Sequence, residues 1–300
     1  MAVDFDGLPV ELAEVVRALV YLHAPSILVV LLCRMSLVGF DFKSCLDALE
    51  ICAGEHQVTR ADWERGRRAV PFEIDFDEEV MDLLGDTGFL VCIALSVQLI
   101  LGGKALAAPE CSSWGWMNRH VSGRMIWWPL GRRNQHKVEK ANVMVSRVVL
   151  LLWIWTARGV LWFLEQPVNS YLEYHPRFQE FCKAMVRLRR PVYRKCVMLG
   201  SFGGKTRKAI WLYCLDKCVF ELDRYKTPSG TSAIIKSQLV VNFVDKAGKR
   251  RVTGVAAKLK ASQAYPRGFG QAFAEVYDAN KKAILKKVVY IYISSNLTGW

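Results

Sequence analysis

A cysteine and a glutamate each follow a short apolar run in the middle of the chain. Cys111 stands two residues after Pro109 in the segment LAAPECSSW, and Glu165 ends the run WFLE. A cysteine reacts as its thiolate, and a carboxyl group at the end of a buried strand must be solvated, paired or used. Free cysteines are more often inert and buried than reactive. Two interpretations of Cys111 therefore stay open, a nucleophile at the edge of a sheet and a buried thiol.

The elements that must position these residues are predicted from an alternation of apolar runs and helix-like stretches. Parallel strands covered by helices on both faces are typically near-continuous apolar runs. The pattern predicts an α/β fold with a doubly wound, mostly parallel, Rossmann-like sheet. The last two strands can pair as an antiparallel hairpin because only a short glycine-rich loop separates them. The expected strands are Leu46–Ile51, Val70–Asp75, Lys104–Pro109, Val160–Gln166, Cys196–Gly200 and Ile210–Leu215, and the expected helices are Val58–Ala69, Glu78–Leu101, Val138–Thr156 and His175–Arg189.

We expect three regions along the chain. Residues 1–44 form an N-terminal extension, residues 45–218 the α/β domain, and residues 219–300 a small, basic α+β accessory region. In the accessory region, Leu239–Val244 and Val252–Val255 flank a basic turn and predict a β-hairpin. A helical stretch over 271–287 and an apolar strand, Val288–Ile293, are expected after it.

Cysteine usage and apolar segments bear on the compartment and on membranes. The nine cysteines are scattered, which favours a reducing compartment, nuclear or cytoplasmic. Cys214 and Cys218 lack a matching second pair, so we expect a structural role and no metal. Ala18–Cys33 and Val148–Ala157 are too short to span a bilayer, so we expect buried core segments and no membrane partner. A targeting segment within the first 40 residues stays open.

The charge is strongly polarised along the chain. Residues 1–110 carry 8 basic and 18 acidic residues, whereas residues 111–300 carry 33 basic and 10 acidic ones. Such a distribution predicts a positive region that binds a polyanion, nucleic acid first among them. A solvated basic surface without a ligand is the alternative. Tryptophans interleaved with arginines after Cys111 suit stacking on bases and holding phosphates, although some of these tryptophans could instead pack under the loop.

The ends of the first two expected strands carry features of a nucleoside site. Gly54 allows close backbone approach to a ligand, and Glu73 lies at the end of the next strand, placed to accept hydrogen bonds from ribose hydroxyls. The alternative is a plain turn beside an exposed acidic edge. Neither G-x-G-x-x-G nor a P-loop occurs, so dinucleotides and nucleoside triphosphates are disfavoured. Further on, Arg207 follows a glycine-containing loop and is suited to pinning a carboxylate or phosphate.

The order of these pieces resembles the cytosine-5 DNA methyltransferases, which use S-adenosylmethionine. LEICAGEHQVTRA is similar to their first motif, FEID to the acidic second motif, APECSSW to the nucleophile loop, FLEQP to the glutamate strand and SFGGKTRKAIWL to a later basic motif. The resemblance covers residues 45–215 and departs from the family at His56, where a second glycine is usual, and at Glu110, where a proline is usual. An adenine or small-molecule methyltransferase is disfavoured, because PECS lacks the Asn/Asp-Pro-Pro-aromatic tetrapeptide.

The resemblance implies a function and a set of site residues. The function is methyl transfer to carbon 5 of cytosine in nucleic acid, DNA rather than RNA, through a cysteine adduct on a flipped or single-stranded base. The alternative is a degenerate methyltransferase-fold protein that only binds nucleic acid. The implied catalytic residues are Cys111, Glu165 and Arg207, and the implied cofactor-binding residues are Cys52, Gly54, Glu73, Asp82 and Pro109. The residues expected to bind nucleic acid, from charge and aromatic clustering, are Trp114, Arg119, Arg124, Lys205, Lys249, Arg250 and Arg251.

Overall fold

The computed structural model describes residues 7–204, 208–226, 240–244, 248–254 and 264–297, and its centre is a six-stranded mixed sheet. The strand order is β2-β1-β3-β4-β6-β5, and only β6 runs against its neighbours. The prediction of an α/β fold with a mostly parallel sheet is confirmed, as is the antiparallel pairing of the last two strands. The strands are β1 (Leu46–Ile51), β2 (Ala69–Phe72), β3 (Leu99–Ala107), β4 (Leu161–Pro167), β5 (Tyr193–Met198) and β6 (Ala209–Cys214).

The order of the strands reverses between β1 and β3. From β1 the chain moves to β2 on one side, and β3 then returns to the other side of β1. Ligands of open α/β sheets bind beyond the carboxyl ends of the strands at such a reversal. The segments that follow β1 and β3 begin at Cys52 and Ala108, and both continue the ladder, since Cys52 donates to Phe72 and Ala108 to Ile51. The fold therefore brings the segments of Gly54 and Cys111 to one edge.

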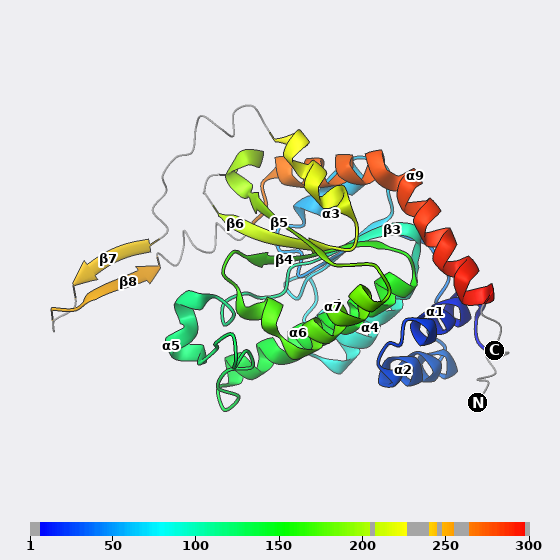
Figure 1. Ribbon diagram of the computed structural model, residues 1–300, viewed down its shortest axis with the longest axis horizontal. Coiled ribbons are helices and arrows are strands. Elements are labelled where there is room, and N and C mark those ends of the chain that lie inside the picture. Colours follow the sequence, from blue (N-terminus) through cyan, green and yellow to red (C-terminus); the bar gives the residue numbers. More distant parts are fainter. Residues whose placement is uncertain (1–6, 205–207, 227–239, 245–247, 255–263, 298–300) are drawn as a thin grey trace.

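Helices cover both faces of the sheet (Figure 1). On one face lie α3 (Gln57–Trp63), α9 (Arg267–Leu297) and the 3-10 helix η4 (Lys217–Tyr225). On the other lie α4 (Asp86–Val97), α6 (His136–Ala157) and α7 (Pro176–Arg187). Alternate residues of β4 enter the two cores: Trp162 and Leu164 pack with α6, and Leu161 and Phe163 pack with α9. Strand side chains alternate between faces, so Glu165 faces the α9 side.

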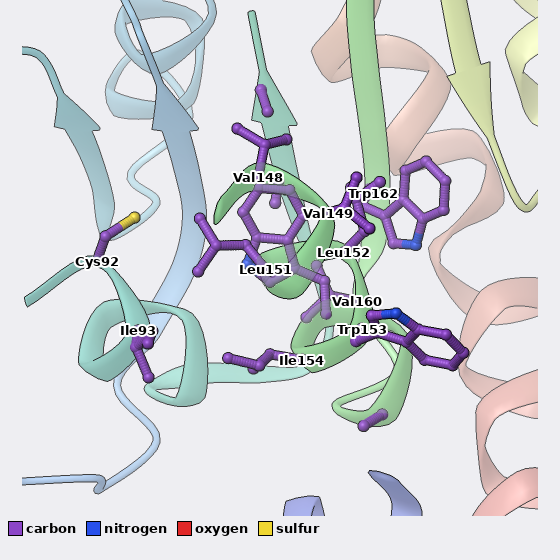
Figure 2. Packing of buried hydrophobic residues seen from close by; sticks show 14 of the residues in the cluster. Cys92, Ile93, Val148, Val149, Leu151, Leu152, Trp153, Ile154, Val160 and Trp162 are labelled. Carbon is purple, nitrogen blue, oxygen red and sulfur yellow. The ribbon is translucent and has the colours of Figure 1, made fainter. Parts of the chain in front are cut away.

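The larger core is built around α6. Figure 2 shows side chains from Val148 to Ile154 packed against Cys92 and Ile93 of α4 and against Trp162. Among the described residues, α6 is the one helix long and apolar enough to cross a membrane, and two thirds of its most apolar window is buried inside the protein. Val148–Ala157 is therefore a core segment, as expected.

The N-terminal extension is a helical pair that joins this core. The helices α1 (Val10–Tyr21) and α2 (Ser26–Leu37) contribute buried side chains such as Leu19 and Leu32. The buried Arg158, just after α6, donates to the Leu99 carbonyl at 2.7 Å and lies 3.5 Å from Glu14 of α1. Residues 1–44 therefore share the core of the α/β region.

Two expected helices are shorter than the sequence indicated. Val58–Ala69 was expected to be helical, but α3 ends at Trp63 and Ala69 begins β2. Glu78–Leu101 was expected to be helical, but α4 begins at Asp86 and β3 already begins at Leu99. The Asp77 carboxylate accepts from the Glu79 and Val80 amides, and the Asp82 carboxylate accepts from the Leu84 amide. These local hydrogen bonds favour turns over helix.

The C-terminal region confirms one expectation and corrects another. The strands β7 (Val240–Val244) and β8 (Arg250–Gly254) form the expected antiparallel hairpin, which stands apart from the sheet in Figure 1. The expected strand Val288–Ile293 is wrong, because α9 continues as one helix to Leu297. Extending an existing helix is easier than starting one, so the β-branched residues of this segment follow the helix before them.

Candidate active site

Two segments cross the edge of the sheet where the strand order reverses, and hydrogen bonds hold them together. The loop after β3 carries Pro109 and Cys111, and Gln166 lies near the end of β4, next to Glu165. Gln166 Nε2 donates to the Pro109 carbonyl at 2.8 Å, and its Oε1 accepts from Ser170. The Tyr171 amide donates to the Trp114 carbonyl at 2.9 Å. The residues next to Cys111 and Glu165 are thus fastened to each other.

Cys111 and Glu165 belong to one electrostatic cluster with two residues that the sequence reasoning missed. The pKa of Cys111 responds to the Glu165 carboxyl and to the Lys208 ammonium. Lys208 Nζ lies 3.9 Å from Glu165 Oε1. The Tyr265 hydroxyl interacts with Glu165, and its pKa is raised by burial first and then by the negative charges of Glu165, Glu50 and the Cys111 thiolate. Tyr265 is therefore surrounded by the groups of this site.

Glu165 is a buried carboxyl group with one unused oxygen. It is 5% exposed, and its Oε1 has no hydrogen-bond partner. Burial raises its pKa, while Lys208 and Tyr265 lower it, and burial dominates. A buried oxygen without a partner is costly, so a ligand donor or a proton on this carboxyl would satisfy it.

Cys111 rests as a thiol. Burial raises its pKa, the Glu165 carboxylate adds to the rise, and Glu110 makes a small further contribution in the same direction. Lys208 acts in the opposite direction. Neutralising Glu165 would therefore favour the Cys111 thiolate, because Glu165 raises the Cys111 pKa more than Glu110 does.

The predicted cofactor residues gather after β1 and β2. The Gly54 amide donates to Glu73 Oε2 at 2.8 Å. Gly54 has φ of +50°, and nothing lies within 4 Å of where its Cβ would be. Burial raises the pKa of Cys52 to about 12, and carboxylates of Glu73, Glu110 and Asp82 contribute to the rise. The surroundings of Cys52 are therefore acidic, and the space at Gly54 is open.

His56 begins α3 in a left-handed conformation, with φ of +43°. Its ring packs against Phe76 and Trp63, with centroid separations of 5.3 and 5.8 Å. Its Nε2 accepts a hydrogen bond from Arg60 Nε at 3.0 Å. The imidazole is therefore held along the first turn of α3.

Trp114 and Arg124 correct the predicted nucleic-acid contacts, because both are 0% exposed. The Arg124 guanidinium lies over the Trp114 ring at 3.4 Å and donates to the Ser113 carbonyl and hydroxyl. It also donates to the Pro129 and Val138 carbonyls and to the Asn142 side chain. Burial lowers the pKa of Arg124 to about 10. These two residues build the loop after Cys111 and do not face solvent.

The remaining tryptophans and arginines of this loop form an exposed surface. Trp127 is 79% exposed and Trp128 63%, and the Arg119 guanidinium lies 5.4 Å from the Trp116 ring. We call this the aromatic–basic surface and define it by Trp116, Arg119, Trp127, Trp128, Arg132 and Arg133, all exposed. Arg119 begins the short helix α5 (Arg119–Ser122), which lies at the same end of the molecule as the β7–β8 hairpin in Figure 1.

The other predicted residues are partly described. Lys249 and Arg250 are exposed at the hairpin, and Arg251 is in β8. Lys205 and Arg207 lie outside the described residues. Lys208, next to them, meets Glu165, and its signal in the sequence was the cationic end of the glycine loop. Tyr265 had no comparable signal, because it follows the hairpin 100 residues beyond Glu165.

The part of the chain that the structure describes contains no group of three or more His, Cys, Asp or Glu side chains able to hold a metal ion. The fold and the cluster define an α/β protein with acidic groups around Cys52 and an interacting thiol and carboxyl group at one edge of the sheet. Comparison with protein-family models and with curated proteins finds no match to this chain.

Proposed function

We propose that this protein has a Rossmann-like methyltransferase fold and transfers a methyl group from S-adenosylmethionine to carbon 5 of cytosine in nucleic acid, DNA rather than RNA. The observation that carries the proposal is the grouping of Cys111, Glu165 and Lys208 at the edge where the strand order reverses. A thiol, a buried carboxyl group with an oxygen that accepts no hydrogen bond, and a cation are the groups that this chemistry needs.

The residues after β1 and β2 fit the cofactor. Gly54 leaves its backbone open to close approach by a ligand, and Glu73 has a second oxygen for ribose hydroxyls. The carboxylates of Glu73, Asp82 and Glu110 around Cys52 suit a sulfonium cation. When bound there, S-adenosylmethionine supplies the methyl group as an electrophile.

The protein's own groups activate the base. The Cys111 proton passes to the Glu165 carboxylate, and the sulfur bonds to carbon 6 of cytosine, which makes carbon 5 nucleophilic. A protonated Glu165 holds ring nitrogen 3 and stabilises the adduct. A neutral Glu165 also no longer repels the negative charge of the Cys111 thiolate, which Lys208 stabilises. After transfer, carbon 5 gives its proton to water, and the bond between sulfur and carbon 6 breaks with its electron pair on sulfur. Glu165 then returns its proton to the Cys111 thiolate, which restores the thiol and the carboxylate.

The nucleic-acid partner is proposed from the aromatic–basic surface. Three exposed tryptophans with Arg119, Arg132 and Arg133 follow the nucleophile loop directly. Aromatic side chains stack on unpaired bases and arginines hold phosphates. Because a base within a duplex cannot reach Cys111, the target is single-stranded or flipped out.

A second candidate is a catalytically inactive relative that binds nucleic acid. The specific observation in its favour is the raised pKa of Cys111, to which Glu110 contributes, together with His56 in the first turn of α3. A protonated thiol is a poor nucleophile.

Calorimetry with S-adenosylhomocysteine separates the two candidates. The enzyme proposal predicts heat of binding that Glu73→Ala weakens and that Glu55→Ala, at an exposed position in the loop after β1, leaves unchanged. No heat, with nucleic-acid binding retained, would support the second candidate. Where binding is seen, Cys111→Ser should abolish methyl transfer and Cys182→Ser, in α7, should not.

A further inference from the structure

A pocket of about 820 Å³ lies at the opposite edge of the sheet from Cys111. It opens where β4 begins, at Leu161 and Trp162, and where β5 begins, at Tyr193. The other walls come from the ends of α1 and α7, from η4 and from α9. Glu165 is four residues further along β4, which is roughly 13 Å in a strand. The pocket is therefore separate from the candidate active site.

The lining combines apolar walls with an excess of cations. Leu161, Trp162 and Ile284 form buried apolar walls. The charged lining residues are Arg189, Arg190, Lys217, Lys286 and a single acid, Asp216. Pockets for small organic ligands have this size and this mainly apolar character, with a few polar groups that fix orientation. Because cations outnumber acids in the lining, the pocket favours a ligand with a negative charge.

Arg190 gives the second, independent indication of a ligand. Its Nη1 atom is buried and has no hydrogen-bond partner. Burial lowers the pKa of this guanidinium, and Asp216 acts in the opposite direction. A buried guanidinium nitrogen without an acceptor is costly, and an anionic oxygen is the strongest acceptor available to it.

We propose that this pocket binds an organic anion with an apolar or aromatic body, whose carboxylate or phosphate group meets Arg190. The body lies against Leu161, Trp162 and Ile284, while Lys217 and Lys286 add long-range attraction at the exposed rim. The proposal does not depend on methyl transfer, because none of these residues belongs to the cluster of Cys111 and Glu165.

The test uses the full chain and the fluorescent probe anilinonaphthalene sulfonate, which has an aromatic body and one anionic group. The proposal predicts saturable binding at one site. Decanoate and phenyl phosphate should both displace the probe, and the stronger of the two identifies the preferred anionic group. Inorganic phosphate alone should displace it poorly, because it lacks an apolar body. Displacement by S-adenosylhomocysteine would place the probe at the Cys111 edge and overturn the proposal.

Charge-reversal variants on one helix provide the decisive comparison. Lys286→Glu should weaken probe binding severalfold, and Lys282→Glu, also exposed on α9 but outside the lining, should not. Arg190→Met should weaken binding about tenfold or more, as expected for loss of a charge-assisted hydrogen bond. Urea unfolding checks that each variant folds. If Arg190→Met does not fold, the Lys286→Glu variant still tests the proposal, because Lys286 is exposed. Equal binding by the Lys286 and Lys282 variants, or non-saturable binding by the wild type, would overturn the proposal.

Discussion

Glu50 and Glu165 are both buried carboxyl groups on strands, but their partners differ. Glu50 Oε2 accepts from the Thr59 amide at 2.7 Å and from the Thr59 hydroxyl at 2.6 Å. Glu165 meets the Lys208 cation and Tyr265, and the Oε1 atom of each of the two carboxyl groups accepts no hydrogen bond. Glu50 thus fastens β1 to α3, whereas Glu165 belongs to the cluster of Cys111 and Lys208.

Glu50 makes the stability of the fold dependent on pH. Burial raises its pKa from 4.5 to about 7. Because the folded state binds the proton more tightly, this stabilisation is complete below pH 4.5 and is lost as the pH rises through about 7. Glu50→Gln should therefore be more stable than the wild type at pH 8, by up to about 3 kcal/mol, and similar to it at pH 4.5.

Urea unfolding of both proteins at the two pH values measures this difference. Glu55→Gln is the matched control, since Glu55 is exposed in the next loop. A wild type that gains stability relative to Glu50→Gln between pH 4.5 and pH 8 would contradict the assignment.

Glu165 should control the reactivity of Cys111. Glu165→Gln removes the larger of the two carboxylates that raise the Cys111 pKa, so alkylation of Cys111 by iodoacetamide at neutral pH should become faster. Glu180→Gln, at an exposed position of α7, should leave the rate unchanged. Mass spectrometry of the Cys111 peptide gives the rate, and a slower reaction in Glu165→Gln would mean that the two groups do not interact.

At the scale of elements, the sequence predicted the sheet better than the segments beyond it. β1 was predicted with its observed bounds, and the other strands within a few residues at most ends, because buried strands are marked by short apolar runs. The strand Val288–Ile293 was wrong, because local β-propensity cannot reveal that a helix begins at Arg267 and continues through it.

The loop after Cys111 shows what local sequence cannot resolve. Trp114 and Trp127 stand in similar surroundings in the sequence, yet one is buried and the other is exposed. Their difference depends on Arg124, whose acceptors come from as far along the chain as Val138 and Asn142. Burial of this kind is set by tertiary contacts. The Cys111–Glu165 pairing was predictable, because Cys111 follows β3 and Glu165 lies near the end of β4, its parallel neighbour.

Substitution of Arg124 should therefore affect the stability of the fold, whereas substitution of Arg119 should affect nucleic-acid binding. Arg124→Met leaves the carbonyls of Ser113, Pro129 and Val138 without their donor, so it should lower the free energy of unfolding by roughly 3 kcal/mol or more. Limited proteolysis should then cut within residues 111–135. Arg119→Met, at an exposed position, should leave both measurements unchanged and weaken nucleic-acid binding. Wild-type stability in Arg124→Met would show that this guanidinium does not hold the loop.

At the scale of the whole molecule, the polarised charge separates two kinds of surface. The acidic N-terminal third supplies the carboxylates of the proposed cofactor edge, whereas the basic remainder supplies the aromatic–basic surface and the hairpin. A cationic cofactor and a polyanionic substrate can thus be attracted to neighbouring parts of one protein.

Binding to single-stranded DNA should depend on both stacking and charge. Trp127→Ala should weaken it by about 1–3 kcal/mol without changing thermal stability, because the ring is exposed. The logarithm of the binding constant should fall linearly with the logarithm of salt concentration, and Lys249→Gln with Arg250→Gln should make the slope shallower. Fluorescence anisotropy at several salt concentrations measures both effects, and a salt-independent affinity would exclude phosphate contacts.

The central claim is that the Cys111 thiol attacks a cytosine ring at the edge where Glu165 and the cofactor meet. The most direct measurement is covalent trapping on single-stranded DNA that contains 5-fluorocytosine, with S-adenosylmethionine present, followed by peptide mapping. A fluorine at carbon 5 cannot leave as a proton does, so the adduct persists after methyl transfer. The account predicts one cross-linked peptide, containing Cys111, that is lost in Cys111→Ser. No adduct under conditions where both ligands bind, or an adduct at another cysteine, would contradict it.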